Sequence, residues 1–252
     1  IFRKILGIPH GIFLVTGPTG CGKTTTLYSG LKEINSIDEK LLSVEDPVEY
    51  DMEGIMQVQV REAVNMTFAN ALRAFLRQDP DRIMVGEIRD VETASMAIQA
   101  SLTGHLVLST LHTNDAAGAV TRLIDMGVEP FLISSTVCGV LAQRLIRRIC
   151  SNCKEDYEPS DAELEAINLT RDEVGDMSFA QGRGCQICNQ AGYKGRIGIF
   201  ELLPLSHAVQ RLVNDRQPTL VIRDQAMQEG MRTLRQSGIE LVTQGITTAQ
   251  EV

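Results

Sequence analysis

The chain has 252 residues, of which 43% are apolar and 22% charged, and its formal net charge is −8. This length allows one large core with an appendage or two small domains, and the composition excludes wholesale disorder. The acidic balance disfavours a protein that coats nucleic acid, because such binding is dominated by basic residues on phosphates. No apolar run approaches the roughly 20 residues that span a bilayer, and no signal peptide is recognisable. Since the chain opens on Ile1 rather than methionine, we expect a fragment of a longer protein.

Residues 1–149 alternate short β-branched runs with helical periodicity, which predicts an α/β fold with a largely parallel sheet. Strands are expected at 12–15, 41–44, 83–85 and 106–108. Helices are expected at 23–34, from a Thr67 cap through 76, from an Asp90 cap to near Gly104, from Asn114 or Asp115 to just before Gly127, and from Pro130 to Ile149.

The rest of the chain differs in amino-acid composition and pattern. Residues 150–198 hold four of the six cysteines, many charges and several glycines, which is typical of a small, loop-rich insert. Residues 199–252 have the pattern of short amphipathic helices. We therefore expect three parts, with boundaries at 149/150 and 198/199.

A phosphate-binding loop is the clearest motif. Residues 17–24 fit the pattern G-x-x-x-x-G-K-[ST], with an apolar strand before it and an amphipathic helix after it. Glycines let backbone N–H groups curl around phosphate oxygens, Lys23 would reach the β- and γ-phosphates, and Thr24 would coordinate Mg²⁺. The alternative is a glycine-rich turn with a surface lysine. The residues predicted to bind nucleotide here are Gly17, Pro18, Thr19, Gly20, Cys21, Gly22, Lys23, Thr24 and Thr25.

Two carboxylates follow predicted strands, Glu45 after 41–44 and Glu87 after 83–86. Ligands of an open α/β sheet bind at the carboxyl ends of its strands, so both are expected to face the phosphate loop. One can polarise the attacking water while the other holds the Mg²⁺ shell. Alternatively both are solvated turn residues. Adjacent charges that could orient the pair, or lie plainly on the surface, are Asp46, Glu49, Arg89 and Asp90.

Two of the four histidines, His105 and His112, flank the strand expected at 106–108. They could sense the γ-phosphate and pass the signal to a neighbouring domain, or each could be a structural residue.

Two cysteine pairs, Cys150-x-x-Cys153 and Cys185-x-x-Cys188, are separated by 31 residues. Such pairs suit a tetrahedral zinc site, because each pair places two thiolates on one side of the metal. Four cysteine ligands leave no open position, so the expected role is structural. Two disulfides or unrelated cysteines are the alternatives, and the reducing cytosol expected for a P-loop ATPase disfavours disulfides.

Four ordered segments identify a family resemblance: GPTGCGKTTTLY, SVEDPVEYD, RQDPDRIMVGEIRDVETA and TGHLVLSTLHTNDA. They resemble the Walker A, aspartate, Walker B and histidine boxes of the GspE/PilB-like secretion ATPases of type II secretion and type IV pilus assembly. The cysteine pairs and GYKGRIGIFELL resemble the metal-binding insert of the assembly branch. The resemblance implies a RecA-like P-loop NTPase core at 1–149, a zinc-binding insert at 150–198 and a C-terminal helical region at 199–252, with the family's N-terminal domains absent.

The same resemblance implies roles and partners. Glu45 would be the general base, Glu87 would act through the Mg²⁺ shell, and His105 and His112 would form the histidine-box pair. The expected protein is a cytoplasmic homo-hexamer at the bacterial inner membrane that hydrolyses ATP to drive pseudopilus or pilus assembly. Its partners would be an inner-membrane platform protein and a cytoplasmic membrane-associated adaptor, with no nucleic acid. Cys21 departs from the more usual serine. The alternatives are a RecA-like nucleic-acid-dependent ATPase and a non-catalytic nucleotide-sensing scaffold with a zinc module.

Overall fold

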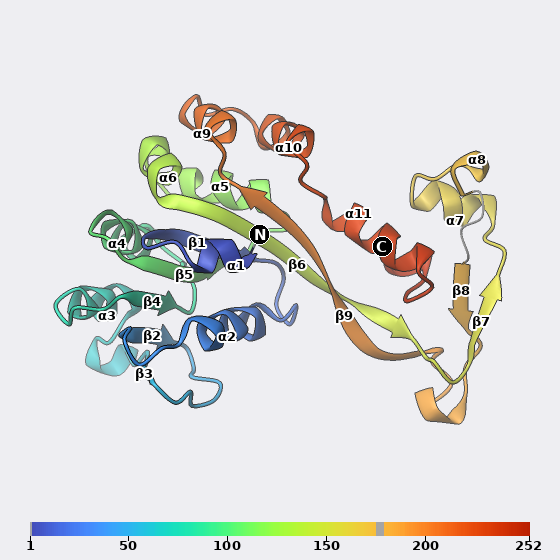
Figure 1. Ribbon diagram of the computed structural model, residues 1–252, viewed down its shortest axis with the longest axis horizontal. Coiled ribbons are helices and arrows are strands. Elements are labelled where there is room, and N and C mark those ends of the chain that lie inside the picture. The colour runs from blue at the N-terminus through green and yellow to red at the C-terminus, as the bar shows by residue number, and fades with distance from the viewer. Residues whose placement is uncertain (1, 175–178) are drawn as a thin grey trace. The chain divides into compact units, whose positions relative to one another are not determined.

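The computed structural model describes residues 2–174 and 179–252 (Figure 1). The chain divides into two compact units, the first formed by Ile1–Ala142 with Leu202–Met231 and the second by Gln143–Glu201 with Arg232–Val252. This differs from the expected three parts. The 198/199 boundary falls inside strand β9 (Tyr193–Pro204), and the C-terminal region is shared between the units instead of forming a part of its own.

A seven-stranded sheet has the order β3-β2-β4-β5-β1-β6-β9. Strand β6 begins in the first unit and ends in the second, whereas β9 begins in the second unit and ends in the first. The pairs β1–β5, β1–β6, β2–β3, β2–β4 and β4–β5 are all parallel, which confirms the expected fold class. The predicted strands are β1 (Gly11–Thr16), β2 (Leu41–Glu45), β4 (Arg82–Val85) and β5 (Leu106–Leu111). The sequence did not predict β3 (Ile55–Gln59) or β6 (Val137–Ile149).

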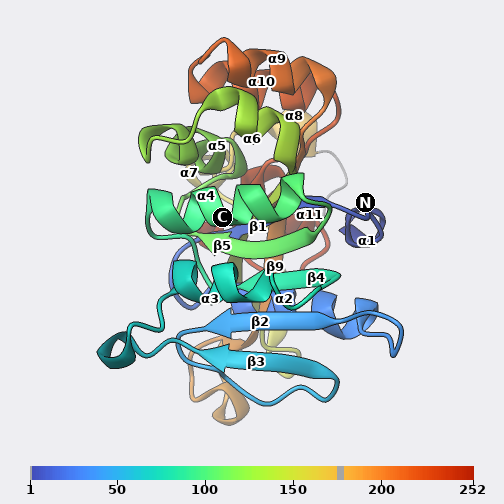
Figure 2. The ribbon, with the colours of Figure 1, turned by 90° about the vertical axis from the view of Figure 1, so that its left-hand side faces the viewer.

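Helices cover both faces of this sheet (Figures 1 and 2). On one face Phe13 and Val15 pack in a buried cluster with Leu27 and Leu31 of α2. On the other, Ile12 and Leu14 line a small apolar cavity with residues of α4, α5 and α6. The helices are α1 (Phe2–Leu6), α2 (Lys23–Ile34), α3 (Phe68–Phe75), α4 (Val91–Leu102), α5 (Ala116–Asp125) and α6 (Pro130–Thr136), with a 3₁₀ turn η1 (Glu62–Val64).

The expected N-caps of three helices are confirmed. The side chains of Thr67, Asp90 and Asp115 accept hydrogen bonds from backbone N–H groups in the first turns of α3, α4 and α5. Each satisfies a donor that has no partner within its own helix. These caps fix the first residues of α3, α4 and α5, which follow β3, β4 and β5 along the chain.

The helix expected from Pro130 to Ile149 was wrong beyond Thr136. The chain turns to extended backbone at Val137, and β6 lies parallel to β1 with Val140 paired to Leu14. Apolar periodicity could not distinguish a helix from a strand here, because Val140, Leu141 and Ala142 are all buried. Pairing with β1 satisfies the backbone of this segment, and its valines and Gly139 favour a strand over a helix interior.

Two further helices complete the first unit, α9 (His207–Asn214) and α10 (Thr219–Gln228). Polar contacts join them to α5 and α6: the hydroxyls of Thr121 and Thr219 lie 2.7 Å apart, and Ser134 donates to Asn214 over 2.9 Å.

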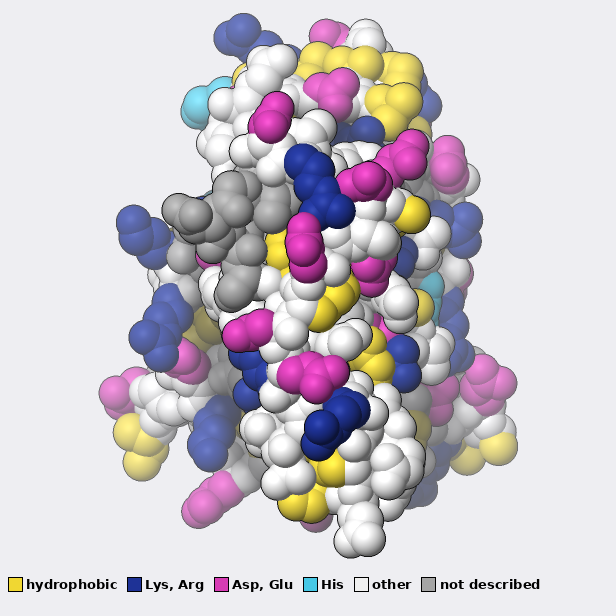
Figure 3. Space-filling view, turned by 90° about the vertical axis from the view of Figure 1, so that its right-hand side faces the viewer, with side chains coloured by type: hydrophobic (Ala, Val, Ile, Leu, Met, Phe, Trp, Pro, Cys, Tyr) yellow, Lys and Arg dark blue, Asp and Glu magenta, His cyan; other side chains and the backbone are white. Residues whose placement is uncertain are grey.

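The second unit contains the antiparallel pair β7 (Lys154–Tyr157) and β8 (Phe179–Gly182). Its helices are α7 (Asp161–Ala166), α8 (Arg171–Val174) and α11 (Leu234–Thr243), with 3₁₀ turns η2 (Gln186–Cys188) and η3 (Ala249–Glu251). Leu164, Ile167, Phe179, Val242 and Ala249 form its apolar cluster. Charged side chains of both signs are interspersed on the face shown in Figure 3. Among the described helices, none has the length and apolar character needed to cross a membrane.

Candidate nucleotide site and metal centre

The phosphate loop joins the end of β1 to the start of α2. Gly20 and Gly22 have φ of 77° and 89°, a left-handed conformation that glycine adopts without steric cost. Lys23 Nζ donates to the carbonyl oxygens of Gly17 at 2.9 Å and Pro18 at 3.1 Å, so the lysine lies across its own loop. Thr24 and Thr25 are exposed. Because the residue before α2 is a glycine, the first N–H groups of the helix face an anion site without a capping side chain.

Thr16 ties this loop to the end of β5. Its hydroxyl lies 2.7 Å from that of Thr113, and the Thr113 N–H donates to it at 2.8 Å. Thr16 is fully buried. Sequence reasoning missed this pair, although the position of Thr16 at the end of an apolar strand gave a signal for burial.

Glu87 contacts residues of two motif segments, and a residue of a third segment is linked to it through Arg89. One of its oxygens lies 3.1 Å from His112 Nε2, and the other accepts a hydrogen bond from Arg89. Arg89 also contacts Asp46 at 3.4 Å. Partial burial alone would raise the pKa of Glu87, but the hydrogen bonds and charges of Arg89 and His112 outweigh burial and hold this pKa below its usual range. Glu87 is therefore an ionised carboxylate with organised neighbours. Asp90, in contrast, serves as the α4 cap.

Glu45 lies in different surroundings, which do not fit the expected general base. Its side chain is buried, with only 3% of the residue exposed. One carboxylate oxygen accepts from Tyr28, and the other accepts from Ser43 at 2.6 Å and Gln57 at 3.0 Å. Among the described residues, no side-chain hydrogen bond or ion pair joins Glu45 to Glu87, Arg89 or His112. Glu45 was correctly expected at the end of a strand, but its side chain is buried in the protein interior.

His105 also lies away from the phosphate loop. It precedes β5, at the amino end of the strand, whereas His112 follows it at the carboxyl end. The strand between them is about 20 Å long. His105 Nδ1 lies 2.8 Å from the carbonyl oxygen of Ala100 and 3.1 Å from the Thr103 hydroxyl, at the end of α4. Among the described histidines, His112 contacts Glu87, whereas His105 bonds to the end of α4.

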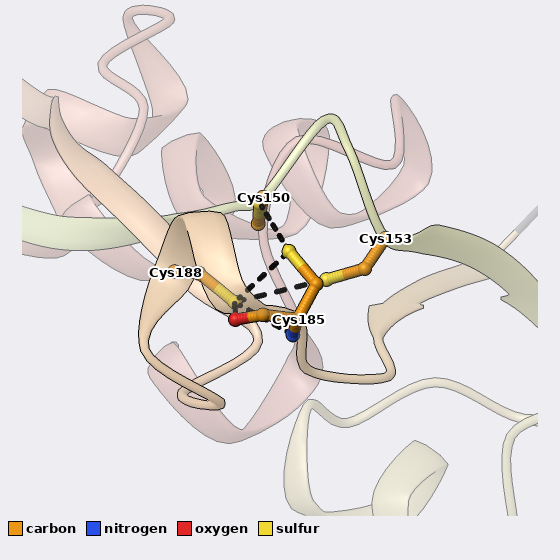
Figure 4. Close-up of side chains that lie close together, drawn as sticks. All are labelled: Cys150, Cys153, Cys185 and Cys188. Carbon is orange, nitrogen blue, oxygen red and sulfur yellow. Dashed lines mark hydrogen bonds between the residues drawn. The ribbon is translucent and has the colours of Figure 1, made fainter.

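The four cysteines Cys150, Cys153, Cys185 and Cys188 converge in the second unit (Figure 4). Sulfur atoms lie 3.9 Å apart for Cys150 and Cys185, 3.9 Å for Cys153 and Cys188, and 3.7 Å for Cys185 and Cys188. A tetrahedral zinc ion with Zn–S bonds of about 2.3 Å requires sulfur–sulfur separations of about 3.8 Å. A disulfide requires about 2.05 Å. The donor set and spacing therefore fit a tetrahedral metal ion and not disulfides.

Two polar contacts favour thiolates at Cys185 and Cys188. The Cys185 N–H donates to the Cys188 sulfur at 3.2 Å, and the Asn152 side chain donates to the Cys185 sulfur at 3.3 Å. The Asn152 hydrogen bond is the main reason that the pKa of Cys185 falls to about 6. Donors of this kind surround the sulfur atoms of metal-binding thiolates and tune them.

Comparison with known proteins gives consistent matches over the whole chain. A family model described as "Type II/IV secretion system protein" matches residues 1–252. The type II secretion system ATPase E of Vibrio cholerae is 54% identical over 255 residues, covering 100% of this chain and 49% of that protein. The type IV pilus assembly ATPase PilB of Thermus thermophilus is 50% identical over 251 residues, covering 100% of this chain and 28% of that protein.

A solved structure is also similar. The pilus retraction motor PilT with bound ADP superposes with a TM-score of 0.71 at 29% identity, covering 99% of this chain and 65% of that chain. The chain spans about half or less of the length of the two curated relatives above.

Proposed function

The chain belongs to the family of type II/IV secretion system proteins, and from this premise we propose that it is the nucleotide-binding part of an ATP-hydrolysing motor for pseudopilus or pilus assembly. The observation that carries the proposal is the phosphate loop at the end of β1, with Glu87 and His112 at the ends of the neighbouring strands β4 and β5. Parallel α/β sheets bind ligands at this edge. The likeness to PilT, whose structure holds ADP, supports a nucleotide as the ligand.

The residues of the site divide the work of phosphoryl transfer. Lys23 would exchange the carbonyls of Gly17 and Pro18 for the β- and γ-phosphates of ATP. Thr24 and, through water, Glu87 would hold Mg²⁺, which when bound neutralises charge that develops on the phosphates. His112 and Arg89 orient the Glu87 carboxylate from its two sides.

The relatives suggest the setting in which this chemistry is used. Their names are those of a type II secretion ATPase and a type IV pilus assembly ATPase. We propose accordingly a homo-hexamer on the cytoplasmic side of the bacterial inner membrane, with a membrane platform protein and a membrane-associated adaptor as partners. We propose further that the four cysteines hold one structural Zn²⁺, a role that their donor set and spacing support.

The test is ATP binding and hydrolysis by the full-length protein. Lys23→Ala should lose both, whereas Glu87→Gln should keep binding and lose at least about 100-fold in kcat, because charge at the metal and water is removed while shape is kept. Lys32→Ala, an exposed lysine of the same helix, is the matched control and should behave as wild type. Unchanged hydrolysis in Glu87→Gln would refute the assigned role. Hydrolysis that depends on added DNA would favour the nucleic-acid motor instead.

A further inference from the structure

The network around Glu45 connects three elements of the first unit. Tyr28 comes from α2, which follows the phosphate loop, Ser43 lies with Glu45 on β2, and Gln57 comes from β3. All three donate to the same carboxylate. Burial is the main reason that the pKa of Tyr28 is raised, and the Glu45 carboxylate adds to it, so the phenol keeps its proton and remains a donor.

The same two side chains that reach Glu45 from other elements also hold the loop that joins β2 to β3. The Tyr28 hydroxyl accepts from the Glu49 N–H at 3.3 Å. The Gln57 amide donates to the Tyr50 carbonyl at 3.3 Å and accepts from the Met52 N–H at 2.7 Å. The rings of Tyr28 and Tyr50 pack edge to face with centroids 4.5 Å apart. The loop backbone is thus held at Glu49, Tyr50 and Met52 by two side chains that also bond to Glu45.

The loop begins with Asp46, which contacts Arg89, which in turn contacts Glu87. Order in residues 46–52 therefore bears directly on the carboxylate assigned to the metal. Meanwhile both oxygens of Glu45 are occupied by donors and shielded from solvent. A general base must come within hydrogen-bond reach of the proton that it takes, directly or through one water.

We propose that Glu45 is a positioning residue, whose buried carboxylate orders the loop of residues 46–52 through Tyr28 and Gln57 and so places Asp46 beside Arg89 and Glu87. It does not take the proton of the attacking water. This inference rests on the proposed ATP hydrolysis for its effect on turnover, whereas its effect on the loop is independent of that function.

The decisive variant is Glu45→Gln in the full-length protein. The glutamine amide can keep two of the three hydrogen bonds and reverse the third: its oxygen can accept from Ser43 and Gln57, and its NH₂ can donate to the Tyr28 hydroxyl oxygen instead of accepting from it. A positioning role predicts a kcat within about threefold of wild type, because the hydrogen-bonded shape is kept. A general base contributes about 10²–10⁴-fold, all of which the amide would lose. Glu45→Ala removes the common acceptor of three hydrogen bonds and should lower kcat at least about tenfold.

Hydrogen–deuterium exchange of the peptide covering residues 46–52 tests the loop directly, without nucleotide. Exchange should be faster in Glu45→Ala and in Tyr28→Phe, and unchanged in Glu45→Gln. Tyr157→Phe is the matched control, since it removes a tyrosine hydroxyl that donates to Glu163 at 3.1 Å in the second unit. It should leave exchange in residues 46–52 as in wild type.

The outcomes separate this inference from the proposed function. Loss of about 100-fold or more in Glu45→Gln with unchanged exchange would overturn it, because Glu45 would then act on the reaction itself. Unaltered exchange in both Glu45→Ala and Tyr28→Phe would overturn it equally. Wild-type protein without hydrolysis would defeat the proposed function, and the exchange pattern would still decide whether Glu45 orders the loop.

Discussion

Removal of one of the four cysteines proposed as zinc ligands should disorder both cysteine turns of the second unit, the knuckles at residues 150–153 and 185–188. The substitution is Cys185→Ser, which removes a sulfur atom that lies 3.7 Å from the sulfur of Cys188 and 3.9 Å from that of Cys150. The buried cluster at the knuckles consists of the cysteines alone, and the neighbouring Ile187 is 53% exposed. Among the described residues, the knuckles therefore have no apolar core of their own that could take the place of the proposed metal.

The magnitudes show which interaction holds this region. Three of the cysteine side chains are buried and Cys185 is partly buried. Their burial contributes about 1 kcal/mol for each buried side chain, on the scale of a buried methylene, or about 3–4 kcal/mol together. Structural zinc contributes apparent free energies of about 10–16 kcal/mol in small zinc domains. The proposed metal would therefore contribute about three times as much free energy as this packing. The apolar cluster around Leu164, Phe179 and Val242 should survive its loss in part.

Elemental analysis and thiol alkylation measure the effect. Wild-type protein should contain one zinc per chain, and its four knuckle thiols should react with a maleimide only after a chelator is added. Cys185→Ser should lack zinc and expose the three remaining thiols at once. Cys138→Ser is the matched control and should keep the metal. Burial raises the pKa of the Cys138 thiol to about 12, so it should stay unreactive in wild type with or without chelator.

One result would refute this reasoning. Metal-free wild-type protein whose knuckle thiols resist alkylation and whose thermal unfolding is unchanged by chelator would mean that packing alone orders the knuckles. The sulfur spacing in Figure 4 would then have no bearing on metal binding.

Three further predictions concern stability and are measured by chemical denaturation. Arg82→Met should destabilise the first unit by about 3 kcal/mol, because the Arg82 side chain is only 11% exposed and its guanidinium donates two hydrogen bonds to Glu39. A double-mutant cycle with Glu39→Gln should give a coupling free energy of about 1 kcal/mol or more. Strictly additive effects of the two substitutions would contradict this prediction. Asp115→Ala should cost about 1 kcal/mol through loss of the α5 cap, whereas an unchanged midpoint would exclude capping as its role. The pKa of Glu251 is lowered mainly by Arg147, so its contribution is present above the unfolded-state carboxyl pKa and is lost as the pH falls through the folded-state pKa. Glu251→Gln should therefore differ from wild type most at neutral pH and least in acid, and a gap independent of pH would rule out this linkage.

Local patterns in the sequence predicted the elements that depend on neighbouring residues. The phosphate loop between β1 and α2 follows from glycines and a lysine in one short run. The caps Thr67, Asp90 and Asp115 follow from side chains that bond backbone three residues ahead. Each cysteine pair likewise is a local feature, since two residues between ligands suit one side of a metal.

Tertiary structure decided what depends on partners far along the chain. Val137–Ile149 is a strand because β1 lies beside it, and a wholly buried apolar run has no periodicity of its own to show this. Glu45 and Glu87 both follow apolar runs, yet Glu45 points to donors on α2 and β3 whereas Glu87 meets His112 and Arg89. His105 and His112 flank one strand and are separated by its length. The order of residues along the chain shows which chemical groups follow which strands. Which of these groups face each other depends on the packing of elements that are distant in the sequence. Side chains along a strand point alternately to the two faces of the sheet, and the elements packed on each face provide their partners.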